Sequence, residues 1–151
     1  MSGASSAIPP DGVGEAIVHA SCVALEGRGV LILGPSGSGK STLALQLMGF
    51  GARLVSDDRT RLVPREGRLI ARAPAAIAGR IEARGIGILG AEALEEAPLL
   101  LAVDLGQSET QRLPAERAFT ALGCEVPLCH GPVSPHFPAA IVQYLKGGRI
   151  A

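Results

Sequence analysis

The sequence predicts a single α/β domain with a mixed β-sheet built around a phosphate-binding loop. Residues 34–41 read Gly-Pro-Ser-Gly-Ser-Gly-Lys-Ser, between the apolar run 30–33 and a helical stretch at 42–48. A strand, a glycine-rich loop and a helix in this order form the context of a P-loop. Predicted hairpins on both sides add antiparallel strands to that core, which indicates a mixed sheet. The 151 residues, 47% of them hydrophobic, suffice for one domain with its own core.

The segment before the loop predicts an arm and a hairpin. Residues 1–14 are rich in Ser, Gly, Ala and Pro and predict a loose arm, which leaves 15–151 for the P-loop domain. Residues 16–25 are mostly apolar, as in a strand, and Gly27 and Gly29 predict a tight turn into the strand that precedes the loop.

The segment after the loop predicts a helix that ends at glycine. Leu43 and Leu47 share one face of the stretch 42–48, and Gly49 and Gly51 should end it.

More strands follow this helix. Residues 52–56 form a short apolar strand that ends at Asp57 and Asp58, and residues 61–70 predict a hairpin with a Glu-Gly turn at 66–67.

The C-terminal third is predicted to alternate again between strand and helix. Residues 98–105 read as a buried strand, 112–124 as a short polar helix or turn, and 125–129 as a last strand. Residues 139–145 predict a C-terminal helix. Its buried face should contain Ile141, Tyr144 and Leu145.

Composition excludes several classes of function. The 14 basic and 14 acidic residues balance, so no electrostatic footprint for nucleic acid or an anionic membrane is present. No leader pattern and no long apolar stretch suggests secretion or a membrane span, so we expect a cytoplasmic protein. The odd number of cysteines predicts reduced thiols. Cys22, Cys124 and Cys129 are expected as small buried hydrophobes, with zinc ligation by the last two and His130 as the weaker alternative.

The loop itself predicts binding of a nucleoside triphosphate with Mg²⁺. Its glycines let backbone N–H groups turn toward phosphate oxygens, and the following helix adds its partly positive N-terminus. Lys40 should reach the outer phosphates, and the hydroxyl of Ser41 should bind Mg²⁺. The expected nucleotide-binding residues are Gly34, Pro35, Ser36, Gly37, Ser38, Gly39, Lys40, Ser41 and Thr42.

The acidic residues distinguish between kinds of P-loop protein. Asp57 and Asp58 follow the strand after the P-loop helix, where carboxylates can face the outermost phosphate. Asp104 ends a later apolar strand, at the position of the Mg²⁺-holding carboxylate of ordinary P-loop NTPases. Spacing alone leaves both assignments open, and Asp57 and Asp58 could also be loop residues that stabilise a turn.

Four segments in the same order resemble the catalytic half of the bacterial HPr kinase/phosphorylase family. They are His19, residues 34–41, Leu-Val-Ser-Asp-Asp at 54–58, and Ile-Glu-Ala-Arg-Gly-Ile-Gly-Ile at 81–88. The resemblance implies a fold like that of phosphoenolpyruvate carboxykinase. It also implies an ATP-dependent kinase that phosphorylates a serine of the phosphocarrier HPr in a bacterial phosphotransferase system, and a homo-oligomer, since the family forms hexamers.

The resemblance also implies residue roles. Asp57 matches the carboxylate that takes the proton of the substrate serine, and Asp58 matches its partner. His19 matches the family histidine beside the phosphates, and Lys40 the catalytic P-loop lysine. With this assignment Asp104 becomes a structural residue at a strand end.

Further roles concern the metal and the signature segment. Ser41 and Glu82 match the Mg²⁺ ligands, and Arg84 matches the signature arginine, expected at the site or at a subunit contact. Glu82 lies in an apolar segment, where a buried carboxylate without a partner would be costly.

Two other functions remain open from the residues. A small-molecule P-loop kinase would use Asp57 to hold its substrate and would need a basic lid, for which Arg59, Arg61 and Arg65 are the candidates. A non-catalytic ATP-sensing module would be indicated by loss of the catalytic acid, but Asp57 is present.

The sequence departs from the family in two places. Typical members have a separate N-terminal domain, whereas 18 residues precede His19 here, which suggests a form with the catalytic domain alone. The family also has a Pro-Gly-Arg-Asn-like loop, where this chain reads Gly-Pro-Val-Ser-Pro-His-Phe-Pro at 131–138. The expected arginine is absent, which makes reverse phosphorolysis doubtful.

We therefore predict forward kinase activity with weak or undetectable dephosphorylation of phosphoserine-HPr. Phosphorolysis brings two phosphate dianions together, and the loop 131–138 supplies no guanidinium to offset their repulsion. The measurement is release of pyrophosphate from phosphoserine-HPr at millimolar phosphate. Robust release would contradict the prediction and would assign the missing charge to Arg84 or to a neighbouring subunit.

Overall fold

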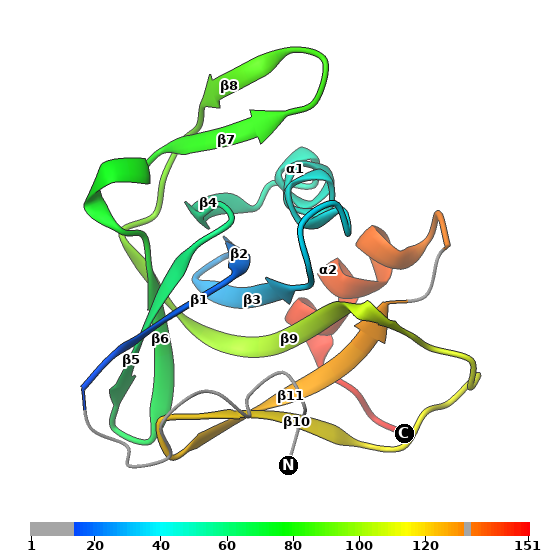
Figure 1. Cartoon of the computed structure of the whole chain (residues 1–151). Coiled ribbons are helices and arrows are strands. Elements are labelled where there is room, and N and C mark those ends of the chain that lie inside the picture. The colour runs from blue at the N-terminus through cyan, green and yellow to red at the C-terminus, as the bar shows by residue number, and fades with distance from the viewer. Residues whose placement is uncertain (1–13, 132–133) are drawn as a thin grey trace.

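The computed structural model describes residues 14–131 and 134–151 (Figure 1). The expected N-terminal arm therefore lies, apart from Gly14, outside the described residues, and so do two positions of the loop 131–138. The division into an arm and a catalytic domain stays a prediction.

A mixed nine-stranded sheet forms the centre of the fold, as the sequence predicts. Its strand order is β1-β5-β6-β9-β3-β2-β4, and β11 pairs with β9 and with β10. β9 runs parallel to β3 and β11, whereas the other pairs are antiparallel. The strands are β1 (Ala16–Val18), β2 (Ala20–Leu25), β3 (Arg28–Leu33), β4 (Arg53–Ser56), β5 (Thr60–Arg65), β6 (Arg68–Arg72), β9 (Glu96–Ser108), β10 (Arg117–Ala121) and β11 (Cys124–Gly131).

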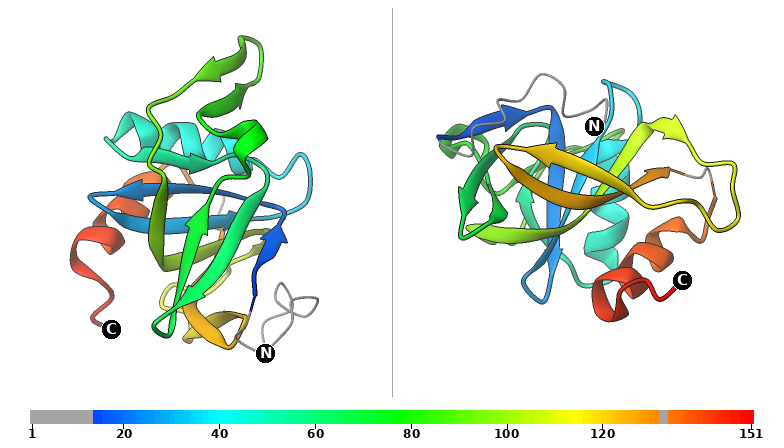
Figure 2. Two further views of the ribbon diagram at one scale, coloured as in Figure 1. Left: turned by 90° about the vertical axis from the view of Figure 1, so that its left-hand side faces the viewer. Right: turned by 90° about the horizontal axis from the view of Figure 1, so that it is seen from below.

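The two faces of this sheet bury different sets of residues. The helices α1 (Lys40–Gly49) and α2 (Phe137–Gly147) cover one face, and pack on Val30 and Ile32. On the other face the sheet curls over itself, and encloses Leu31, Leu33 and Phe119. Figure 2 shows β10 and β11 on the opposite side of the sheet from α1. Because alternate residues of β3 point to opposite faces, a strand buried on both sides is apolar throughout.

The P-loop helix begins and ends at glycine. Gly39 is its N-cap at φ 101°, a left-handed conformation that favours glycine. At the other end the N–H of Gly51, at φ 104°, donates to the carbonyl of Met48. The helix is one turn longer than the predicted 42–48, because the last P-loop residues already have helical hydrogen bonds, such as the 2.9 Å bond from Leu43 N to Gly39 O.

The predicted strand 16–25 is in fact two strands that break at His19. β1 pairs with β5, whereas β2 pairs with β3 and β4, so the chain changes neighbours at this residue. The side chain of His19 is 70% exposed as a result, which excludes a core histidine.

The segment 112–124, predicted as a short polar helix or turn, contains a strand as well as a turn. Its residues 117–121 form β10, an edge strand paired antiparallel with β11, followed by a turn at Leu122 and Gly123 with φ of 51° and 76°. Phe119 and Ala121 point inward on alternate positions. A strand of five residues carries little periodicity of its own, so the tertiary pairing decides its structure.

A second, two-stranded sheet stands apart from the main one. It consists of β7 (Arg80–Ala83) and β8 (Gly87–Gly90), preceded by the short 3₁₀ helix η2 (Ala75–Ile77). In Figure 1 this hairpin lies above α1. Buried Ile81 packs it into the helical side of the core, while Ile86 and Ile88 are exposed.

Other predicted elements are confirmed. The hairpin β5–β6 turns at Glu66 and Gly67, and α2 contains the predicted helix 139–145, although Tyr144 is half-buried. No helix in the described ranges is long and apolar enough to cross a membrane.

The cysteines lie on or beside the core. Cys22 and Cys124 are buried in the cluster on the curled side of the sheet. Burial raises the pKa of the Cys22 thiol, and raises that of the partly buried Cys129 to about 11. Such thiols are protonated and weakly reactive at neutral pH.

Substitution of Phe119 tests how much β10, the strand that was not predicted from the sequence, contributes to stability. We predict that Phe119→Ala lowers the free energy of unfolding by about 3–5 kcal/mol, because it empties a fully buried aromatic site. Phe50→Ala is the matched control, since this side chain is 53% exposed, and should cost about 1 kcal/mol or less. Urea unfolding followed by circular dichroism measures both. Equal losses in the two variants would contradict the placement of β10.

Candidate active site

The P-loop and four acidic or basic positions enclose a pocket of about 440 Å³ at the N-terminus of α1. The acidic pair comes from the end of β4, and two further residues come from β7 and the turn after it. The structure therefore brings together segments that lie up to 48 positions apart in the chain. The pocket is lined by Ser36, Gly37, Ser38, Gly39, Lys40, Ser41, Thr42, Asp57, Asp58, Glu82 and Arg84.

The loop has the backbone shape that phosphate binding requires. Gly34 has φ 152°, and a Cβ there would lie 2.4 Å from the hydroxyl oxygen of Ser38. Gly37 and Gly39 have φ of 83° and 101°, which side chains disfavour. The glycines thus let the loop fold tightly over the first turn of α1, whose free N–H groups form an anion site.

Lys40 lies at the centre of the pocket. Its side chain is 4% exposed, and its ammonium donates hydrogen bonds to the carbonyls of Gly34 at 2.8 Å and Pro35 at 3.2 Å. The same ammonium lies 3.7 Å from Oδ1 of Asp58. The backbone carbonyls thus fix the lysine charge at the point where the loop would surround phosphates.

Asp57 accepts hydrogen bonds from three separate elements. Its Oδ1 accepts from the hydroxyls of Ser41 at 2.6 Å and Ser21 at 2.9 Å, and its Oδ2 accepts from the backbone N–H of Glu82 at 3.0 Å. An ionised carboxylate has acceptors for all of these donors. Asp57 therefore joins α1, β2 and β7 around the pocket.

Asp58 has a different environment from its neighbour. Its carboxylate is 57% exposed and faces Lys40, with Nδ1 of His19 at 3.9 Å. Its backbone has φ 66°, an uncommon left-handed conformation for an aspartate. The side chain is thus directed toward the pocket rather than tied up in the loop.

Glu82 and Arg84 both line the pocket with exposed side chains. Glu82 is exposed although its segment is apolar, because β7 belongs to the separate hairpin, and only its alternate residues Ile81 and Ala83 face the core. The exposed carboxylate is free to approach a cation in the pocket.

Asp104 is not among the pocket residues. Its Oδ1 accepts a hydrogen bond of 2.8 Å from the backbone N–H of Gly106, and the residue pairs with His130 on β11. This arrangement agrees with the structural role expected for it.

Ser21 is a site residue that the sequence analysis missed. It is fully buried, and its hydroxyl contacts both aspartates of the pair. The available signal was a hydroxyl within the otherwise apolar strand Ala-Ser-Cys-Val-Ala-Leu, since a buried hydroxyl needs a partner.

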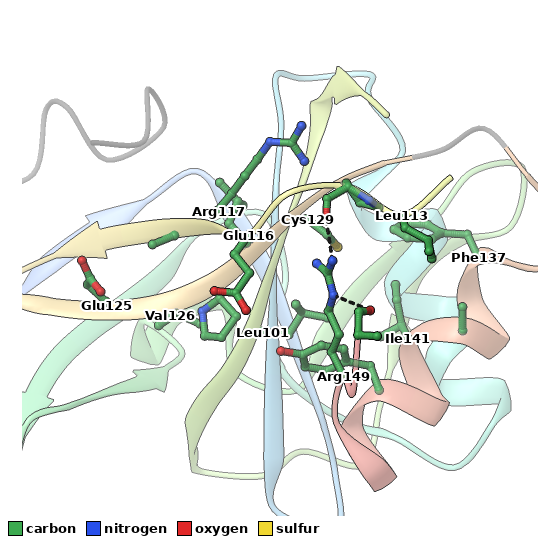
Figure 3. A pocket seen from close by; sticks show the side chains of 17 residues that line it. Leu101, Leu113, Glu116, Arg117, Glu125, Val126, Cys129, Phe137, Ile141 and Arg149 are labelled. Carbon is green, nitrogen blue, oxygen red and sulfur yellow. Dashed lines mark hydrogen bonds between the residues drawn. The ribbon is translucent and has the colours of Figure 1, made fainter. Parts of the chain in front are cut away.

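A larger hollow of about 780 Å³ lies elsewhere, between β10, β11 and α2 (Figure 3). Its walls include Leu101, Val126 and Ile141, and Arg149 on its edge bonds to the backbone carbonyls of Pro114 and Ala151. It contains no P-loop residue and is separate from the phosphate pocket.

Residues 13–140 match the family model of the HPr Serine kinase C-terminal domain. The chain belongs to this family. The match includes every residue of the phosphate pocket and the signature segment 81–88.

Individual relatives agree with the family model. The chain is 44% identical over 75 residues to the HPr kinase/phosphorylase of Clostridium beijerinckii, and 42% identical over 80 residues to that of Clostridium tetani. These alignments cover 50% and 53% of this chain, but 25% and 26% of the relatives. The structure of the Hpr(Ser) kinase/phosphatase from Coxiella burnetii matches with a TM-score of 0.73 and 26% identity, over 87% of this chain and 94% of the other.

Lys40 provides a test of the pocket. We predict that Lys40→Ala weakens binding of a nucleoside triphosphate by about 10-fold or more, because the phosphates lose their contact with a buried ammonium group. Lys146→Ala, at the far end of α2, is the control and should bind normally. Titration with a fluorescent ATP analogue measures affinity, and circular dichroism confirms the fold. Normal affinity in a folded Lys40→Ala protein would overturn the assignment of the P-loop.

Proposed function

We propose that this chain is the catalytic part of an ATP-dependent protein serine kinase whose acceptor is the phosphocarrier HPr. Membership of the HPr Serine kinase C-terminal domain family supports the proposal. So do the names of the relatives from Clostridium and Coxiella, which are HPr kinases with a phosphorylase or phosphatase activity. The chain aligns with about a quarter of the length of the Clostridium proteins.

One structural observation carries the proposal: two adjacent carboxylates face different parts of one phosphate pocket. Asp57 bonds to Ser41, the expected metal ligand, while Asp58 faces Lys40 and His19. A protein kinase needs both a metal site and a base for the acceptor hydroxyl, and the pair can supply one of each.

The pocket fits Mg²⁺ bound together with ATP. Ser41 and Glu82 present the oxygen donors that Mg²⁺ prefers. Residues 14–131 and 134–151 contain no group of three or more His, Cys, Asp or Glu that could hold a metal ion alone. This agrees with Mg²⁺ chemistry, because one or two carboxylates and substrate phosphates commonly share that ion. When bound, Mg²⁺ would offset negative charge on the phosphates.

Different residues around ATP would have different roles in phosphoryl transfer. The backbone of the P-loop and the ammonium of Lys40 would hold the outer phosphates. Asp57 would fix the hydroxyl of Ser41, whose oxygen remains available to the metal while its proton is donated to the carboxylate.

We assign the base to Asp58 rather than to Asp57. The resemblance matched Asp57 to the base, but three donors already occupy its carboxylate. Asp58 is exposed toward the pocket, so it can accept the proton of an incoming serine hydroxyl. His19 would help to orient the Asp58 carboxylate, because its Nδ1 lies 3.9 Å from the same oxygen that faces Lys40.

A small-molecule kinase is less consistent with these contacts. Of the three arginines considered as a lid, Arg61 pairs with Glu15 and Arg65 pairs with Glu96, and none lines the pocket. An open site suits a protein acceptor better than a lidded one. A non-catalytic ATP sensor would have no use for the preserved acidic pair.

Oligomer formation is also part of the proposal. The family resemblance implies a hexamer, and the exposed β7–β8 hairpin with Arg84 lies beside the pocket, where a neighbouring subunit could complete it.

The function is tested by incubating the protein with radiolabelled ATP, Mg²⁺ and purified HPr. The expected product is acid-stable phosphoserine on HPr. Labelling that acid removes would indicate phosphohistidine, and no labelling would reject the proposed acceptor.

The division of roles between the aspartates has its own prediction. Asp58→Asn should lower the rate of transfer by about 100-fold or more, with nucleotide affinity within a few-fold, because the base is lost. Asp57→Asn should instead raise the Mg²⁺ concentration needed for half-maximal rate by about 10-fold or more, because the support of Ser41 is lost. Rates measured across a Mg²⁺ titration separate the two. The reverse result would return the base to Asp57. If Asp104→Asn abolished transfer while both other variants were mild, an ordinary P-loop arrangement would be correct.

A further inference from the structure

We propose that Ser21 is a positioning residue for phosphoryl transfer, and that its hydroxyl sets the arrangement of Asp57 and Asp58. The inference rests on the proposed kinase function. It assigns a task to a residue outside the P-loop, the acidic pair and the signature segment.

The hydroxyl of Ser21 bridges the two aspartates. It donates a hydrogen bond of 2.9 Å to Oδ1 of Asp57, and it accepts one of 3.0 Å from the backbone N–H of Asp58. Ser21 is 0% exposed, so solvent does not compete for either bond. A hydroxyl can donate once and accept twice, so a single oxygen serves both neighbours.

The bond to Asp58 fixes an unfavourable backbone conformation. Asp58 has φ 66°, in the left-handed region that non-glycine residues rarely adopt. The tight turn continues with a hydrogen bond of 2.8 Å from the backbone N–H of Arg59 to the carbonyl of Asp57. Held in this way, the Asp58 carboxylate reaches within 3.7 Å of the Lys40 ammonium. Without the hydroxyl of Ser21, the backbone N–H of Asp58 at the centre of the turn has lost its hydrogen-bond acceptor.

The bond to Asp57 acts on the metal side of the pocket. Ser21 and Ser41 donate to the same oxygen of Asp57, from β2 and from α1. With both in place the carboxylate has one orientation, in which its other oxygen accepts from the backbone N–H of Glu82. One buried hydroxyl therefore couples the metal ligand to the base.

A neighbouring threonine distinguishes this role from ordinary core packing. Thr60 is also 0% exposed, and its hydroxyl donates a hydrogen bond of 2.8 Å to the carbonyl of Ala20. In the part of the chain that the structure describes, this hydroxyl bonds to neither aspartate. Thr60→Val removes a buried hydroxyl close to Ser21 and keeps the shape of the side chain, so it is the matched control.

The experiment compares steady-state phosphorylation of HPr by the unmodified protein, Ser21→Ala, Ser21→Thr and Thr60→Val. We expect Ser21→Ala to lower kcat by about 10- to 100-fold, the usual scale for the support of a metal or catalytic group. KM for ATP should stay within about threefold, because the P-loop is unchanged. Ser21→Thr keeps the hydroxyl and should recover most of the rate, and Thr60→Val should retain the normal kcat.

A double variant tests whether Ser21 acts through Asp58. If it does, adding Ser21→Ala to Asp58→Asn lowers the remaining rate by much less than it lowers that of the unmodified protein. Fully multiplicative losses would overturn the proposal. So would an unchanged kcat in Ser21→Ala, or an equal fall in Thr60→Val.

Hydrogen exchange supplies a readout that does not depend on the acceptor. The amide of Asp58 should exchange about 10-fold faster in Ser21→Ala, because it loses its bond, and at the normal rate in Thr60→Val. If the unmodified protein fails to label HPr, the proposed function fails while the exchange result still tests the bridge. If Ser21→Ala does not fold, Ser21→Cys takes its place and the same results are expected. A thiol is similar in size to a hydroxyl but forms only weak hydrogen bonds. Unaltered exchange in the folded variant would reject the bridge.

Discussion

The carboxylate of Asp57 is the contact on which the site depends. Its two oxygens accept hydrogen bonds from the P-loop helix, from a central strand and from the separate β7–β8 hairpin. Within the described residues the hairpin pairs with no strand of the main sheet, so this bond helps to hold it beside the P-loop, together with the packing of Ile81 and Leu89. The positions of Glu82 and Arg84 therefore follow from a group that is not on their own element. A partly buried acceptor with three donors also resists rearrangement, because each donor would lose its partner.

The sequence predicted the framework of the fold well, for physical reasons. Gly34 and Gly39 allow the loop shape, and the apolar strand after the turn at Gly27 is buried on both faces, so each reads clearly in the sequence. The errors fall where pairing decides the structure. β10 has five residues and weak periodicity, and His19 interrupts a continuous apolar run because the chain changes partners there.

The sequence predicted the candidate site less completely than it predicted the fold. The P-loop residues and the acidic pair were found because their spacing along one chain segment is fixed by the chemistry of phosphate binding. The different environments of Asp57 and Asp58 could not be predicted from spacing. They follow from the left-handed backbone of Asp58 and from the hydroxyl of Ser21, which lies 36 positions before Asp57. Glu82 was identified as a site residue, but its exposure could not be predicted from the sequence. Its exposure depends on a hairpin that leaves the sheet, and nothing in its neighbouring residues indicates that.

The central position of β9 has a consequence for how the chain folds. β9 lies between β3 on one side and β6 and β11 on the other, and its partner β3 is roughly 70 residues earlier in the sequence. During synthesis the P-loop strand therefore has an open edge until β9 has emerged. Pairing over such a separation closes a long loop before it gains stability, which makes folding slow compared with a helical protein of equal size. The apolar edge of β3 is exposed to aggregation for that interval.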